Sequence, residues 1–176
     1  MDAIASQSHD HAATFAGLLQ RHRGIVFKVA STYARGAEDR EDLAQEIAAQ
    51  LWRAWPRYDP ARSFSTWMYR VALNVGISHL RGDGRHRRHV VPLDDSLHEA
   101  ADDNPTDHER DQQLRILHGF IATLEPLNRA LLLLYLEDRG TREMAEVLGI
   151  SESNVTTRIS RLKQRIRDHV APPGQD

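Results

Sequence analysis

Hydrophobic residues recur at helical spacing near the carboxyl end of the chain, and they predict a helix after Ser151 with one buried stripe. The stripe consists of Val155, Ile159 and Leu162. A shorter helix is expected from Thr141, and Gly149 between the two can adopt the positive φ that a tight turn demands. Thr141 and Ser151 are residue types that cap helix amino termini. Together these positions are typical of a helix-turn-helix.

The polar side of this second helix suits contact with DNA. Thr156, Thr157 and Ser160 point away from the apolar stripe. The segment from Arg158 to Arg167 contains five basic residues and no acidic one, and basic side chains neutralise phosphates. The alternative is an amphipathic helical hairpin whose cationic face is simply solvated.

A second helical pattern runs from about Glu38 to Trp55. Its apolar stripe is Leu43, Ile47, Leu51 and Trp55, at every fourth position. The roughly opposite side carries Asp42, Glu46, Ala49 and Arg53. A carboxylate-bearing helix face is usually just solvated, but the acidic run from Glu41 to Glu46 favours a protein docking surface as the alternative.

A third helix is expected from about Ser65 to Leu80, with two apolar stripes. Between them lie Trp67, Arg70, Asn74, Ser78 and Arg81. Aromatic rings stack on unpaired bases and amides read base edges, so this face suits nucleic acid, and the loop 59–64 before it could receive a flipped base. The alternative is that Phe64 and Trp67 are core aromatics and that Asn74 makes a local hydrogen bond.

Helical periodicity without strand-like alternation predicts an all-α chain of two small helical domains. We expect the first domain at residues 12–82, a flexible acidic linker at 83–111 and the second domain at 112–170. The linker is acidic because residues 92–111 hold eight carboxylates against the single Arg110. The formal net charge of −2 over 176 residues is unusual for a DNA-binding protein, but the charges are segregated along the chain.

Composition excludes several classes of protein. The chain has no cysteine, which removes disulfides, thiolate metal sites and cysteine catalysis. No run of apolar residues is long enough to insert into a membrane, and no signal peptide is recognisable, so we expect a cytoplasmic protein. The ten histidines are scattered without metal-ligand spacing, and no nucleophile–base pair or phosphate-binding loop is present. We therefore expect no enzyme activity, no catalytic residue, no cofactor and no metal.

Two stretches of the front half resemble conserved region 2 of bacterial extracytoplasmic-function (ECF, group IV) sigma factors. They are Glu41–Ile47 (EDLAQEI), followed by Leu51 and Trp52, and Phe64–Asn74 (FSTWMYRVALN). In the back half, Leu124–Arg129 (LEPLNR) and the helix-turn-helix are similar to region 4. The rival class is an ordinary helix-turn-helix regulator, which would dimerise on a palindromic site without needing polymerase.

The resemblance implies an initiation subunit of bacterial RNA polymerase, with core polymerase and promoter DNA as partners. Family members are often held inactive by an anti-sigma factor, which makes such a protein a candidate partner. Core-polymerase binding would fall on Asp42, Gln45, Glu46 and Arg53. Recognition and melting of the −10 element would fall on Arg62, Phe64, Trp67, Arg70, Asn74, Ser78 and Arg81. Recognition of the −35 element would fall on Asn154, Thr156, Thr157, Arg158, Ser160, Arg161 and Lys163.

The sequence departs from the family pattern at three positions. Thr156 stands where many members carry Lys or Arg, so one phosphate or guanine contact is in doubt. Ser78 replaces a frequent Asp, and Glu125 stands where a helix-breaking residue is common.

Overall fold

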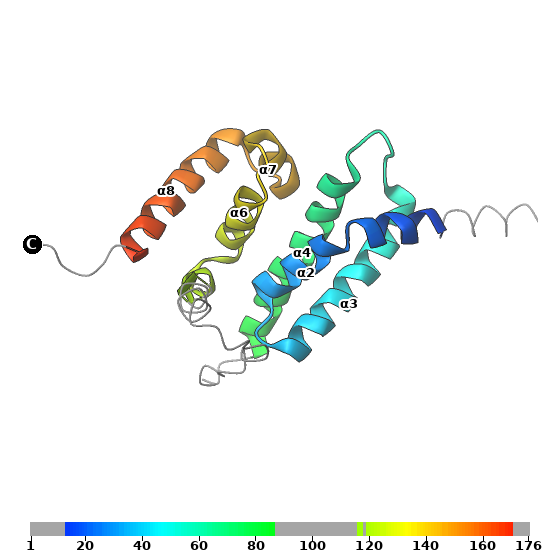
Figure 1. The fold of residues 1–176 in the computed structure, drawn as a ribbon, viewed down its shortest axis with the longest axis horizontal. Helices are drawn as coiled ribbons and strands as arrows, with labels where there is room; N and C mark the ends of the chain where they lie inside the picture. Colours follow the sequence, from blue (N-terminus) through cyan, green and yellow to red (C-terminus); the bar gives the residue numbers. More distant parts are fainter. Residues whose placement is uncertain (1–12, 87–115, 118, 171–176) are drawn as a thin grey trace, which may run out of the picture. The chain divides into compact units, whose positions relative to one another are not determined.

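Two compact helical units make up the protein, Met1–Gly84 and Arg85–Asp176. The computed structural model describes residues 13–86, 116–117 and 119–170 (Figure 1). All regular elements within these ranges are helices, so the prediction of an all-α chain with two small helical domains is confirmed. No helix among the described residues combines the length and apolarity that crossing a bilayer requires.

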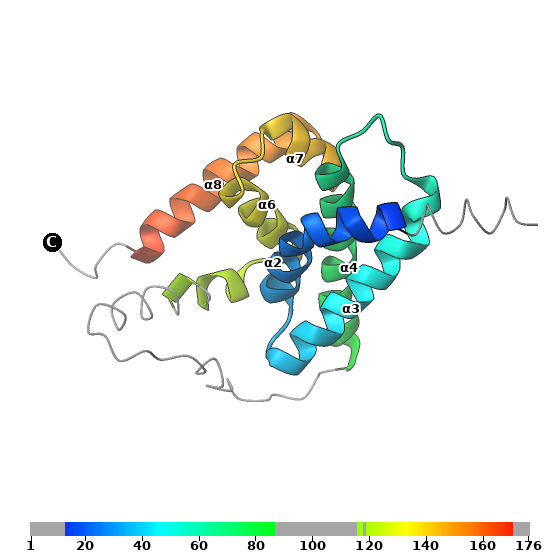
Figure 2. The same cartoon turned by 45° about the vertical axis from the view of Figure 1, so that its right-hand side comes forward.

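Unit 1 is a bundle whose helices bury one stripe each. After the helical residues 13–21 it contains α2 (Arg23–Tyr33), α3 (Ala37–Ala54), the short 3-10 helix η1 (Trp55–Arg57) and α4 (Phe64–His86). The expected stripe of α3 is buried. Helix α2 packs against α3 (Figure 2). The largest fully buried side chains of unit 1 are Val29, Tyr33, Leu43, Ile47, Leu51, Met68, Tyr69 and Leu73.

Helix α4 is longer at its carboxyl end than the sequence predicted. It continues through Gly82 and Gly84 to His86, so the first four residues of the expected linker are helical. Glycine lowers helix stability by only about 1 kcal/mol, whereas the residue that would stop a helix outright, Pro92, comes later. The linker residues 87–111 and the two chain ends lie outside the described residues.

Unit 2 contains α6 (Pro126–Leu136), α7 (Thr141–Leu148) and α8 (Glu152–Val170), preceded by helical residues 119–123. All three helices pack against one another. The expected stripe of α8 is buried, since Val155, Ile159 and Leu162 are at most 9% exposed. Arg129 fixes the entry to α6, donating from Nε to the carbonyl of Leu124 at 3.0 Å and from Nη2 to that of Ala122 at 2.7 Å.

Three features of the helix-turn-helix are expected from the sequence, and the structure has two of them. Gly149 ends α7 in the left-handed region, with the positive φ that the sequence predicts, 66°. Its amide donates to the carbonyl of Ala145. Ser151 caps α8, because its Oγ accepts the amide of Asn154 at 3.2 Å, which confirms that prediction too.

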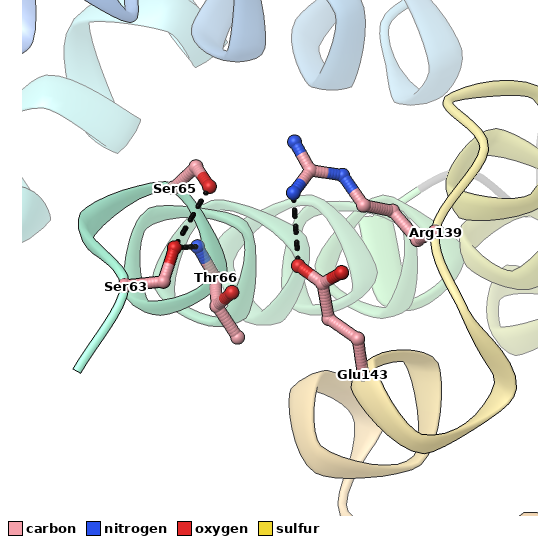
Figure 3. Close-up of polar contacts among 5 residues, drawn as sticks. All are labelled: Ser63, Ser65, Thr66, Arg139 and Glu143. Carbon is pink, nitrogen blue, oxygen red and sulfur yellow. Dashed lines mark hydrogen bonds and ion pairs between the residues drawn. The ribbon is translucent and has the colours of Figure 1, made fainter.

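The expected cap at Thr141 is wrong. The N-cap is Gly140, whose carbonyl accepts the amide of Met144, and no side chain caps α7. The first turn therefore begins one residue earlier than expected, which leaves Thr141 inside the helix. Instead, Arg139 before the helix donates to Glu143 in its first turn, with 2.9 Å between Nη1 and Oε1 (Figure 3).

Candidate nucleic-acid interface

The outer face of α8 presents the residues that the sequence assigned to DNA. Six of them are exposed, and the seventh, Arg158, is half-buried. The exposed residues are Asn154, Thr156, Thr157, Ser160, Arg161 and Lys163. This face begins at the Ser151 cap, so the capped amino terminus and the exposed polar side chains belong to the same end of the helix.

The threonine hydroxyls of this face are turned toward their own helix. Thr156 donates to the carbonyl of Glu152 at 3.0 Å, and Thr157 donates to that of Ser153 at 2.9 Å. With the hydroxyl hydrogens used in this way, the oxygen lone pairs and the methyl groups remain for an incoming partner. These threonines can therefore accept a hydrogen bond from a base amino group or pack against a thymine methyl.

Two cations of the predicted −35 set already have partners inside unit 2. Arg158 donates from Nε to Asn154 at 2.9 Å and from Nη1 to Asn128 of α6 at 3.2 Å. Lys163 Nζ lies 4.6 Å from the ring centroid of Tyr135, a cation–π arrangement. Within the described ranges, Arg161 makes no hydrogen bond, ion pair or ring contact of this kind. It is therefore the cation of this face best placed to neutralise a phosphate.

A second polar face lies on α4 in unit 1. Arg70, Asn74, Ser78 and Arg81 are exposed along it. Ser63 caps the helix, since its carbonyl accepts the amide of Trp67 at 3.1 Å and its Oγ lies 3.5 Å from the amide of Thr66 (Figure 3). Both helices that the sequence assigns to DNA thus begin at a serine N-cap, Ser63 and Ser151.

The loop before α4 is held by a cluster of aromatic rings. Trp55 and Tyr58 are stacked with centroids 5.1 Å apart, and Phe64 meets Tyr58 edge-on at 5.6 Å. Trp67 lies 5.0 Å from Tyr58. The Tyr58 hydroxyl donates to the carbonyl of Arg62 at 2.7 Å, which pins the exposed loop to the cluster.

Burial separates the roles of these aromatics. Phe64 is 8% exposed and Trp67 is half-buried, so the interpretation of Phe64 as a core aromatic fits its position better than direct stacking on a base. Arg62 is exposed and closes the turn of this loop, since its amide donates to the carbonyl of Asp59 at 3.0 Å. The side chain available to an unpaired base at this end of unit 1 is therefore Trp67, with Arg62 beside the loop backbone.

The acidic face of α3 is exposed, as a docking surface requires. Asp42, Gln45, Glu46 and Arg53 are all accessible. Arg53 lies 3.9 Å from Glu46, and Gln50 donates to the same carboxylate at 2.9 Å. Exposed ion pairs contribute at most about 1 kcal/mol to stability, so the fold does not depend on these charges.

An open groove joins this face to the polar face of α4. Glu46 and Gln50 line one wall, and Asn74, Ser78 and His79 line the other. Asp39 ties the helices together at one end, accepting the amide of Arg35 at 2.8 Å and lying 3.1 Å from His79 Nε2. The two surfaces that the sequence assigned to different partners thus share a border.

Sequence reasoning missed two residues that organise these surfaces. Tyr58 could have been noticed as an aromatic residue beside a Pro-containing turn. Asn128 gave no signal, because it meets Arg158 across thirty positions of sequence. Within the described ranges, no group of three or more His, Cys, Asp or Glu side chains is placed to hold a metal ion.

Comparison with known proteins places both units in one family. The sequence profile of Sigma-70 region 2 matches residues 18–86, and that of Sigma-70 region 4 matches residues 114–166. The ECF RNA polymerase sigma factor SigE of Mycolicibacterium smegmatis is 30% identical over 173 residues, covering 96% of this chain and 67% of the relative. The chain belongs to the ECF RNA polymerase sigma factors. As a member, it binds RNA polymerase and directs transcription initiation from promoters.

Further relatives match this sigma factor over nearly its whole length. RpoE of Cereibacter sphaeroides, also an ECF sigma factor, is 29% identical over 176 residues, covering 95% of this chain and 92% of the relative. Two solved structures share the fold. CnrH, in complex with the cytosolic domain of CnrY, has a TM-score of 0.63 at 22% identity, covering 91% of each chain. RpoE of Bartonella quintana, with the anti-sigma factor NepR, has a TM-score of 0.61 at 16% identity, covering 92% and 96%.

Proposed function

We propose that this sigma factor, a group IV member, docks on core polymerase through the exposed face of α3. The proposed contacts are Asp42, Gln45, Glu46 and Arg53. The observation that supports this assignment is that these charged side chains are exposed and that stability does not require them. They are therefore free to serve a partner. The domains that carry out the two DNA roles are proposed at 12–82 and 112–170, joined by residues 83–111.

The face of α4 and the loop before it recognise the −10 element and hold it open. Arg62, Trp67, Arg70, Asn74, Ser78 and Arg81 are the proposed contacts, with Phe64 supporting the loop from beneath. Melting follows from differential binding, because these groups contact flipped bases that duplex DNA cannot present. Unstacking a base costs a few kcal/mol, which stacking on Trp67 and hydrogen bonds from Asn74 can offset.

Helix α8 enters the major groove of the −35 element. The proposed base contacts are Asn154, Thr156, Thr157 and Ser160, and the proposed phosphate contacts are Arg158, Arg161 and Lys163. Phosphate contacts fix the register of the protein on the duplex without reading its sequence. Because Arg158 and Lys163 already have internal partners, Arg161 carries most of the proposed phosphate binding.

The remaining proposals concern chemistry and regulation. Polymerisation belongs to the core enzyme, so this subunit needs no catalytic residue, cofactor or metal, and it acts in the cytoplasm. The fold neighbours CnrH and RpoE were solved with CnrY and the anti-sigma factor NepR. We propose that an anti-sigma factor also binds this chain and that it covers the α3 and α8 faces.

The test separates polymerase binding from promoter opening. Asn74→Ala should leave the affinity for core polymerase unchanged but reduce the permanganate reactivity of unpaired thymines at the −10 element. Equal loss of both would remove Asn74 from the −10 role. A specific gel shift of duplex DNA by the protein alone, on a palindromic site, would favour the rival regulator class.

A further inference from the structure

The guanidinium of Arg158 lies between two carboxamides. Its Nε donates to Asn154 Oδ1 at 2.9 Å, within α8, and its Nη1 donates to Asn128 Oδ1 at 3.2 Å, on α6. Arg158 is half-buried, and so is Asn128, whereas Asn154 is exposed at the start of α8. The contact thus connects α6 with α8, the helix proposed to read the −35 element.

The chemistry of the guanidinium fixes how both amides are turned. A guanidinium has only donors, so each carboxamide must present its oxygen to Arg158. The amide nitrogen of Asn154, which carries two donor hydrogens, consequently points away from Arg158. The backbone amide of Asn154 is bound to Ser151 Oγ at 3.2 Å, so the residue is restrained at both its main chain and its side chain.

This orientation changes which base Asn154 can recognise. The usual pairing of asparagine with adenine needs the amide oxygen to accept from adenine N6 while the amide nitrogen donates to N7. Here the oxygen already accepts from Arg158, so adenine N6 would have to share that oxygen with the guanidinium, whereas the two amide hydrogens of Asn154 are not used by Arg158. Guanine offers two acceptors there, N7 and O6, and no donor on that edge.

We propose that Asn128 is a positioning residue for −35 recognition. Through Arg158 it sets Asn154 as a donor, and Asn154 therefore favours guanine over adenine at one base pair of the −35 element. The inference rests on the proposed function of α8 as the −35 reading helix. A merely structural role for Asn128 would lower transcription from every −35 sequence alike and would not change the order of preference.

The experiment is run-off transcription with core polymerase from two promoter libraries, one randomised at the −35 element and one at the −10 element. The wild type should prefer guanine over adenine at one −35 position by about three- to tenfold, the size of effect expected for one hydrogen bond. Asn154→Asp keeps the bond to Arg158 but has no donor, so the preference should vanish. Asn128→Ala should weaken the preference at the same position.

Asn128→Asp is the conservative control, because its carboxylate still accepts from Arg158 and should keep the preference. The −10 preferences should be the same in all variants. The positioning role would be overturned if Asn128→Ala kept the wild-type preference for guanine while Asn154→Asp lost it. It would also be overturned if Asn128→Ala reduced transcription from all −35 sequences by the same factor. A guanine preference that survived Asn154→Asp would overturn this inference but not the proposed function of α8. A wild type with no −35 preference at any position would overturn the proposed function of α8 as well.

Discussion

Gly76 of α4 lies directly against the ring of Tyr33 in α2. A Cβ built on Gly76 would come within 2.6 Å of Tyr33 Cδ2 and 3.0 Å of Cγ. Tyr33 is only 1% exposed, so its ring has little room to move. The absence of a side chain at position 76 is therefore what allows α4 to approach α2 this closely.

Gly76→Ala should destabilise unit 1 by about 1–3 kcal/mol, the usual effect of overfilling a packed core. The measurement is urea unfolding followed by tryptophan fluorescence, since all three tryptophans lie in unit 1 and report on it alone. Gly82→Ala on the same helix is the matched control. A Cβ on Gly82 meets nothing within 4 Å, so the free energy of unfolding of this variant should rise by roughly 0.5–1 kcal/mol, because alanine favours a helix more than glycine does. Equal effects of the two substitutions would contradict the close contact.

Ser151 and Thr141 should behave differently when each is replaced by alanine. Ser151→Ala removes the acceptor for the Asn154 amide and should weaken the first turn of α8 by about 1 kcal/mol. Thr141→Ala should change the stability of the first turn of α7 by less than about half that amount, because the Thr141 side chain does not cap the helix. Amide hydrogen exchange at residues 141–160 measures both. If both variants lost amide protection to a similar extent, the Thr141 side chain would have to cap α7 after all.

Tyr58→Phe should loosen the loop before α4 while keeping the ring cluster. The substitution removes only the hydroxyl that donates to the carbonyl of Arg62, and it leaves the stacking on Trp55. We expect open-complex formation to fall about two- to tenfold, as for loss of one hydrogen bond, with little change in the stability of unit 1. Stopped-flow measurement of promoter opening checks this. An unchanged opening rate would mean that the loop does not need this anchor.

Reversing charge on the α3 face should weaken polymerase binding without unfolding the protein. In the structure Arg53 lies 3.9 Å from the Glu46 carboxylate, and Glu46→Lys places a second cation beside it. Both side chains are exposed, so water screens the repulsion between them. We therefore expect a loss of at least about tenfold in affinity for core polymerase and a change of less than about 1 kcal/mol in stability. Asp168→Lys, the same charge change at an exposed position of α8, should leave polymerase affinity unchanged. Equal loss in both variants would point to net charge rather than to this face.

Local patterns predicted most of the fold, because the residues that specify it lie within a few positions of one another. The stripe of α8, the turn at Gly149 and the cap at Ser151 each depend on spacing within a single helix or turn. The pattern alone misplaces the N-cap of α7, because Thr141 and the preceding Gly140 are both acceptable N-cap types and only the backbone decides between them.

The parts of the candidate site that sequence could not supply depend on contacts between helices. The pairing of Asn128 with Arg158 joins residues thirty positions apart, and no periodicity predicts it. Phe64 and Trp67 both fit either a core or a surface role by pattern, and only their burial in the ring cluster separates them. The core role of Phe64 follows only from its packing against Trp55 of η1.

The most direct test of the whole account is run-off transcription from a genomic promoter library, using sigma-free bacterial core polymerase with and without this protein. We expect transcripts that require both components and whose start sites share a −10 and a −35 motif at constant spacing. An absence of transcripts that depend on the protein, or dependent transcripts that share only one of the two motifs, would contradict an initiation factor that reads both elements.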